Sequence, residues 1–187
     1  MVPLAFWQNI LITTIASIRN NALEIIMSKI DNILANATFK EHLSRINEAE
    51  IDRIYCLHGI EHLLDVARIS YIINLEESLG FDKETIYAMA LLHDIGRNLE
   101  YEKGVSHHEA GGDIALGILR DAGFDEADCR LICQAIKNHK ELKKGEDKRS
   151  LNYLLFKADK LSRNCFSCKA YDSCYWEESK KNKGITV

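Results

Sequence analysis

The chain has 187 residues, of which 47% are hydrophobic and 28% are charged, and its formal net charge is −4. This size and composition can bury the core of one globular domain, and the mildly acidic charge gives no reason to expect nonspecific binding to nucleic acid or to an anionic membrane. A single proline and the lack of any low-complexity tract argue against long linkers and against an all-β sandwich.

The first segment, residues 1–40, is predicted to be a helical extension. Residues 1–17 carry no charged side chain, but they lack the basic start of a secretion signal, and polar residues interrupt the apolar run of a membrane span. We interpret this part as an amphipathic helix that is packed or loosely attached. Alternatively, Met27 is the natural start and residues 1–26 are incidental.

Beyond this segment, apolar residues recur at intervals of three and four, which predicts an all-α domain over residues 41–163. The first helix of this pattern is expected to run from about residue 56 to residue 79. Asp82 then has the position of an N-cap for a second helix, which continues through an apolar run to His93.

Three more helices are expected downstream. After a polar loop, Ser106 and Glu109 form a capping-box pattern, which opens a helix that ends near Gly123. Asp125 opens the next helix, and His139 lies at its end. The last helix is marked by four apolar residues: Leu151, Leu154, Leu155 and Ala158.

Histidine and aspartate side chains occur within these apolar segments, where a polar group needs a reason to be present. His93 and Asp94 end an apolar run, and the pair can turn toward one cation. His62 and Asp159 also lie on apolar helical faces. Taken singly, His93 and Asp94 fit a capping pair on the surface, and His62 fits a core histidine whose hydrogen bonds are satisfied. Asp159 alone fits a carboxylate paired with a basic residue. A shared cation explains all of them more economically.

The order His, His-Asp, Asp, with the pair written Leu-Leu-His-Asp-Ile-Gly-Arg, resembles the HD-domain superfamily of metal-dependent phosphohydrolases. The resemblance runs from about residue 56 to residue 162. It implies a compact bundle of about five helices around a mononuclear or dinuclear metal site. The implied cofactor is a divalent ion, namely Mn, Fe, Co, Ni, Zn or Mg. The implied ligands are His62, His93, Asp94 and Asp159.

Further histidines extend the resemblance. His107 is similar to a histidine that the family follows with glycine four residues later, and His139 resembles another histidine of the dinuclear members. Those members often have two adjacent histidines there, and this chain has Lys140 at the second position. For His58, His107 and His139, a second-metal role, a substrate-binding role and a structural role all remain open. His108 is expected to face solvent.

The resemblance implies hydrolysis of a phosphate ester or anhydride of a small molecule, with a nucleotide as the favoured substrate. Asp94 would bind metal and orient the attacking water, while Arg97 and, more weakly, Lys160 would bind the phosphate. An exposed loop arginine is the alternative for Arg97. The competing functions are a catalytically silent metal-binding sensor or adaptor domain and a purely structural helical module. Neither a nucleic acid nor a membrane is predicted as a partner.

The last segment, residues 164–187, contains Cys165, Cys168 and Cys174. Their spacing is typical of the start of a zinc or iron–sulfur site, and the fourth ligand would be Cys56, Cys129, Cys133 or a histidine. Redox or disulfide pairing and unligated packing are the alternatives. Six cysteines without a convincing secretion signal favour a cytoplasmic location.

Overall fold

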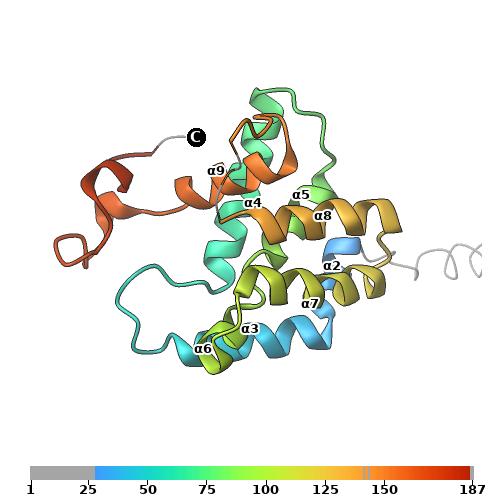
Figure 1. Cartoon of the computed structure of the whole chain (residues 1–187), viewed down its shortest axis with the longest axis horizontal. Helices are drawn as coiled ribbons and strands as arrows, with labels where there is room; N and C mark the ends of the chain where they lie inside the picture. The colour runs from blue at the N-terminus through green and yellow to red at the C-terminus, as the bar shows by residue number, and fades with distance from the viewer. Residues whose placement is uncertain (1–27, 141, 143, 186–187) are drawn as a thin grey trace, which may run out of the picture.

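The computed structural model describes residues 28–140, 142 and 144–185, which form helices and loops without any strand (Figure 1). The predicted all-α class is therefore confirmed. The expectations for residues 1–26 and for Met27 as the natural start lie outside the described residues. In chain order the α-helices are α2 (Lys29–Ala35), α3 (Ala37–Ala49), α4 (Ile60–Glu76), α5 (Lys83–Leu92), α6 (Arg97–Lys103), α7 (His107–Asp121), α8 (Glu126–Asn138) and α9 (Leu151–Leu161).

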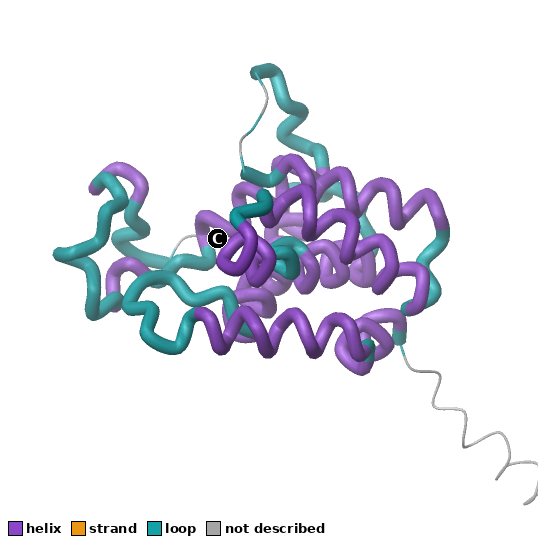
Figure 2. The backbone as a smooth tube through the Cα atoms, turned by 60° about the horizontal axis from the view of Figure 1, so that its bottom comes forward, coloured by secondary structure: helices purple, strands orange, loops and turns teal. Residues whose placement is uncertain are grey.

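The helices lie side by side in one bundle (Figure 2), and their buried side chains form one apolar core. Helix α4 packs against α5 and α9, and α8 packs against α5, α7 and α9. Ile86, Met89 and Ile132 lie fully buried in this core. Each side chain of this size contributes roughly 1.5–3 kcal/mol when it leaves water. The core therefore holds together the helices whose ends carry the histidines and aspartates.

The capping predictions met with different outcomes. The side chain of Asp82 accepts a hydrogen bond from the backbone N–H of Thr85, and Asp125 caps α8 in the same way, as predicted. The predicted capping box at Ser106 is wrong, because the Ser106 side chain makes no capping hydrogen bond. The start of α7 is instead fixed by His107, whose Nδ1 lies 2.7 Å from Oε2 of Glu100.

Two boundaries also differ from the sequence-based expectation. Helix α4 begins only at Ile60, because the residues before it form a loop, so His58 precedes the helix. The polar loop expected after His93 contains α6, a short helix that ends at Gly104 with a left-handed φ of 67°. A helix of 7 residues is too short to produce a clear apolar period.

Helices α2 and α3 pack on the same core as the rest of the bundle. Ile33 on α2 and Phe39 on α3 are both part of the buried apolar cluster, and α3 runs across residue 40, where the predicted domain boundary lies. The division of the chain at residues 40 and 163 stays a prediction. In the described part, none of the helices is long and apolar enough to cross a membrane.

Gly96 brings α6 and α7 into direct backbone contact. A Cβ atom at this position would lie 2.4 Å from the carbonyl oxygen of His107 and 2.5 Å from the backbone nitrogen of Gly111. Any side chain at position 96 would therefore push the two helices apart. This close approach places the start of α7 beside Asp94, two residues before the glycine.

Candidate metal centre

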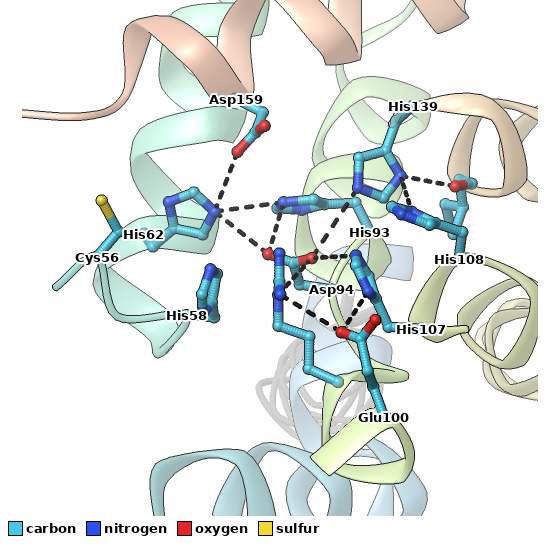
Figure 3. Close-up of polar contacts among 12 residues, drawn as sticks. Cys56, His58, His62, His93, Asp94, Glu100, His107, His108, His139 and Asp159 are labelled. Atoms are coloured by element: carbon cyan, nitrogen blue, oxygen red, sulfur yellow. Dashed lines mark hydrogen bonds and ion pairs between the residues drawn. The ribbon is translucent and has the colours of Figure 1, made fainter. Parts of the chain in front are cut away.

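The four predicted ligands meet at the centre of the bundle (Figure 3). His62 comes from α4, His93 and Asp94 follow α5, and Asp159 comes from α9. Nε2 of His62 lies 3.5 Å from Oδ2 of Asp94 and 3.6 Å from Oδ1 of Asp159. It also lies 3.3 Å from Nε2 of His93. Three helices that are distant in the chain therefore direct their donor atoms at one point.

A second group of donors lies on the other side of Asp94 and consists of His107, His108 and His139. Oδ1 of Asp94 lies 3.6 Å from Nε2 of His107 and 3.9 Å from Nε2 of His139. Its other oxygen, Oδ2, lies 3.1 Å from Nε2 of His93. One carboxylate thus stands between two sets of imidazoles, an arrangement that could bridge two cations.

His108 belongs to this second group, and the expectation that it faces solvent is wrong. The residue is only 7% exposed, and its Nδ1 lies 3.3 Å from Nδ1 of His139. The reason is that the first turn of α7 abuts the end of α8, so that His107 and His108 both point inward. The histidine beside His139 is therefore contributed by α7 and not by position 140.

Hydrogen bonds to the backbone orient two of the imidazoles. Nδ1 of His93 donates to the carbonyl oxygen of Ala90 at 2.7 Å, and Nδ1 of His139 donates to that of Ile136 at 2.6 Å. A carbonyl oxygen can only accept, so Nδ1 carries the proton in both rings. When these rings are neutral, Nε2 therefore presents its lone pair to the centre, as metal-bound histidines commonly do.

Several buried polar atoms at the centre have no hydrogen-bond partner. Both carboxylate oxygens of Asp94 lack a hydrogen bond, although Oδ1 forms an ion pair with Nε of Arg97 at 2.9 Å. Nε2 of His107 and Nε2 of His108 also have no hydrogen-bond partner. An unpartnered buried polar group costs about 1–3 kcal/mol, and more when it is charged. The oxygens of Asp94 and Nε2 of His107, whose Nδ1 donates to Glu100, offer the lone pairs that a divalent cation requires. The residues present therefore fit the metal that the sequence implies.

The protonation states of the second group of histidines suit metal binding. Burial lowers the pKa of His107 to about 3, and the positive charge of Arg97 adds to this effect. Burial likewise lowers the pKa of His108 to about 4 and that of His139 to about 3. These three imidazoles are therefore neutral at pH 7 and free to donate a lone pair.

The two carboxylates are ionised. Burial alone would raise the pKa of Asp94, but the attraction of His93 and Arg97 outweighs it and holds that pKa well below its usual range. For Asp159, burial is outweighed by Lys160 and His93, and the pKa falls to about 2. Both groups are therefore in the charged form that binds a cation.

Arg97 and Lys160 lie beside the donor groups. Nε of Arg97 is 2.9 Å from Oδ1 of Asp94, and the side chain is only 20% exposed, so Arg97 is not an exposed loop residue. Nζ of Lys160 lies 2.5 Å from Oδ2 of Asp159. Both residues also line a cavity of about 960 Å³ that contains His107, His108, His139 and Asp159 in its wall.

The walls of this cavity are strongly cationic, and two of its residues are aromatic. Among the described residues that line it, Asp159 is the one acidic side chain. The guanidinium of Arg163 stacks at 4.8 Å over the ring of Trp176, and Nζ of Lys160 lies 5.2 Å from the centre of the Phe156 ring. The cationic lining residues are Arg97, Lys140, Lys160, Arg163 and Lys180.

His58 takes part in a separate network with Glu50, a residue that the sequence analysis missed. Nδ1 of His58 lies 2.5 Å from Oε1 of Glu50, and the hydroxyl of Tyr101 donates to the same oxygen at 2.5 Å. The rings of His58 and His62 meet edge to face with centres 5.5 Å apart. Glu50 ends α3 far from any motif, so only the fold reveals its role.

Comparison with known proteins supports this architecture. The family model for the HD domain matches residues 59–164. An uncharacterised protein of Clostridium beijerinckii is 44% identical over 158 residues, which cover 83% of this chain and 97% of that protein. The Ribonuclease Y of Mycoplasma mycoides subsp. mycoides is 30% identical over 120 residues, which cover 64% of this chain but only 22% of that longer protein.

A solved structure has the same fold. It is that of a predicted HD superfamily hydrolase from an uncultured Thermotogales bacterium, with a TM-score of 0.54 and 27% identity. The match covers 76% of this chain and 80% of that chain. The family match includes the segments that carry His62, His93, Asp94, His107, His139 and Asp159. The chain therefore belongs to the HD-domain family and is a metal-dependent hydrolase of that type.

Proposed function

We propose that this hydrolase releases phosphate from a small phosphorylated molecule, and specifically from a nucleotide. The observation that carries the proposal is the position of Asp94 between two groups of imidazoles at the wall of a cationic cavity. The two donor groups are suited to neighbouring cations, and the basic side chains are suited to the charges of a phosphate.

The residues divide into two groups of ligands. His62, His93, Asp159 and Oδ2 of Asp94 would hold one divalent cation, and Oδ1 of Asp94 would share a second with three histidines. The histidines of the second group are His107, His108 and His139. When bound, such ions make a nucleophile available from water at neutral pH and polarise the phosphoryl oxygen. Imidazole-rich ligation favours Mn, Fe, Co, Ni or Zn over Mg.

The side chains of the chain itself bind and position the substrate. Arg97 lines the cavity and would direct its guanidinium at phosphate oxygens. Asp94 holds Nε of Arg97 at 2.9 Å, and Nη1 of Arg97 lies 3.7 Å from Oε2 of Glu100. Lys160 is held in the same way by Asp159. Burial of Asp94, which is 1% exposed, excludes water from its oxygens and strengthens their interaction with positive charge.

The aromatic walls support a nucleotide in preference to a plain phosphate ester. Phe156 and Trp176 line the same cavity as the basic residues, so a base could stack while the phosphate reaches Arg97. Stacking of a base on an aromatic ring is worth about 1–3 kcal/mol. The volume of about 960 Å³ is at the upper end of the usual range for small-molecule sites, roughly 300–1,000 Å³.

The experiment is a screen of the metal-loaded protein for phosphate release. Each divalent metal is combined with nucleoside mono-, di- and triphosphates, dinucleotides and a generic phosphate ester. We expect turnover in the native chain and its loss in Asp94→Asn. Asp65→Asn is the matched control, because Asp65 on α4 is a partly exposed carboxylate whose ion pair within the described residues is with Arg68.

The competing function is a metal-binding sensor or adaptor domain without turnover. Lys140, which stands where dinuclear relatives of the implied type often have histidine, is the observation that favours it, and this residue lines the cavity. Tight metal binding with no phosphate released from any substrate would support the sensor and contradict the phosphohydrolase.

A further inference from the structure

A second cluster of potential metal ligands lies outside the histidine–aspartate centre. Cys56, Cys165, Cys168 and Cys174 line one small cavity of about 110 Å³, and all four are free thiols. Figure 3 shows Cys56 directed away from the imidazoles of the metal centre. We propose that these four cysteines bind an iron–sulfur cluster. This inference does not depend on the proposed phosphohydrolase activity.

The local fold explains how the three C-terminal thiols reach the same cavity. The backbone N–H of Cys168 donates to the carbonyl oxygen of Cys165 at 3.1 Å, and that of Tyr171 donates to Cys168 at 3.1 Å. The N–H of Cys174 then donates to Tyr171 at 3.3 Å. Three successive turns, each closed over three residues, wind the segment so that its cysteines return to one side.

Cys56 comes from the loop before α4 and is fixed against this segment by its neighbours. Nε of Arg53 donates to the carbonyl oxygen of Cys56 at 2.8 Å. The hydroxyl of Tyr55 donates to the carbonyl oxygen of Ser173 at 3.1 Å, and its ring meets that of Tyr175 edge to face. The fourth ligand that the three-cysteine spacing requires is thus supplied from a distant part of the chain.

The charge around the cavity suits a group of thiolates. Lys181 lines the cavity, and its side chain is only 6% exposed. Burial raises the pKa of the Cys56 thiol, while the positive charge of Arg163 acts in the opposite direction. Four thiolates around a cluster carry excess negative charge, and Arg163 and Lys181, the latter also paired with Glu178 at 2.7 Å, offset part of it.

The dimensions favour a cluster over a single zinc ion. Tetrahedral zinc with Zn–S bonds of about 2.3 Å brings every pair of sulfurs to about 3.8 Å. Among the described residues, the groups of three or more donors within 4.8 Å of one another all belong to the histidine–aspartate centre, so no three of these thiols are that close. The cavity of 110 Å³ is also large enough for several atoms, since a cavity of about 150 Å³ can hold benzene.

The cysteine cluster also has a structural link to the hydrolase site. Trp176 lines both cavities, and Arg163, Lys180 and Asn182 of the same segment line the larger one. The side-chain amide of Asn182 donates to the carbonyl oxygens of Lys160 and Arg163 at 2.8 and 2.7 Å. A cluster at the four cysteines would therefore hold in place one wall of the substrate cavity.

The test is the content of acid-labile sulfide in the full chain purified without oxygen, or reconstituted with ferrous iron and sulfide. Sulfide is the decisive readout because the histidine–aspartate centre can bind iron but holds no sulfide. We expect sulfide and iron together, with visible charge-transfer absorption that dithionite bleaches. Cys56→Ser and Cys174→Ser should each reduce sulfide and absorption at least tenfold.

Two control variants separate this outcome from loss of the other metal. Cys133→Ser should retain the cluster, because Cys133 lies on α8 and does not line the cavity. Asp94→Asn should retain sulfide while it loses the metal of the hydrolase site. The proposal is overturned if the native chain binds one zinc ion at these thiols without sulfide, if reconstitution gives no sulfide, or if folded Cys56→Ser keeps the full cluster.

Discussion

Nε2 of His107 lies 3.6 Å from Oδ1 of Asp94, and both atoms are buried without a hydrogen-bond partner. A carboxylate oxygen and a neutral imidazole nitrogen that both offer lone pairs do not attract each other. Arg97, whose Nε lies 2.9 Å from the same oxygen, offsets part of this cost, and a divalent cation bound between the two atoms would offset the rest. We therefore expect Asp94 to control the metal occupancy of both donor groups.

The first prediction concerns Asp94→Asn. An amide keeps the shape of the side chain but removes its negative charge, so we expect metal content to fall at least tenfold and phosphate release to disappear. Elemental analysis after gel filtration and a circular dichroism spectrum would measure the metal and the fold. A variant that keeps its metal would contradict the role of Asp94 as a ligand.

His107→Ala should separate the two donor groups. His107 belongs to the group on the Oδ1 side of Asp94, while His62 lies on the Oδ2 side. We expect metal content to fall from about two ions per chain to about one in His107→Ala. His62→Ala should instead weaken the binding of the other ion. Equal metal content in both variants and the native chain would exclude the two-site arrangement.

The contact at Gly96 leads to a prediction about stability. Gly96→Ala would place a Cβ atom against the backbone of α7, and we expect it to lower the free energy of unfolding by about 3 kcal/mol or more. Gly117→Ala is the matched control, because a Cβ there would meet nothing within 4 Å and Gly117 lies inside α7. The control should raise that free energy by about 0.5–1 kcal/mol, as urea unfolding would show.

Much of the fold and of the first ligand group could be predicted because local signals carry them. The cap at Asp82 depends only on residues three apart, and the His93-Asp94 pair sits at the end of an apolar run that defines its own helix. Such features need no knowledge of the tertiary structure.

The remaining features depend on contacts between distant segments. His108 is buried only because α7 meets the end of α8, and Cys56 faces the C-terminal cysteines only because Tyr55 bonds to Ser173. Helix α6 was not predicted, because its 7 residues are too few to show an apolar period. No pattern within the sequence near Glu50 or His108 specifies the tertiary partner of either residue.

Glu50 leads to a prediction about pH. Burial alone would raise its pKa, but hydrogen bonds from His58 and Tyr101 outweigh this and lower the pKa from 4.5 to about 2. The unfolded chain therefore binds more protons than the folded chain between these values. The stability from Glu50 is complete above pH 4.5 and is lost as the pH falls toward 2.

Glu50→Gln should remove this contribution. We expect the variant to be less stable than the native chain by about 2–3 kcal/mol at pH 7, with a difference that narrows as the pH falls below about 4.5. Urea unfolding of both metal-free proteins at several pH values would measure it. Glu48→Gln is a suitable control, since Glu48 is an exposed residue of the same helix. A difference that stays constant with pH would argue against the shifted pKa.

The aromatic wall of the substrate cavity leads to the last prediction. Trp176→Ala should raise KM for a nucleotide substrate about tenfold while leaving KM for a phosphate ester without a ring unchanged, because only the base would stack. Phe166→Ala is the control, since Phe166 is 45% exposed and lines neither cavity. Equal effects on both substrates would point to a general change in the cavity.

The hydroxyl of Ser162, at the end of α9, lies 3.3 Å from Nδ1 of His62, which precedes it by 100 residues. A ribosome extends the chain from the N-terminus at about 5–20 residues per second, so His62, His93 and Asp94 emerge well before the helix that carries Asp159. Until then, one side of the pocket for the cation is open to water. We therefore expect metal loading to follow the synthesis of α9, and a chain truncated before this helix not to retain an ion.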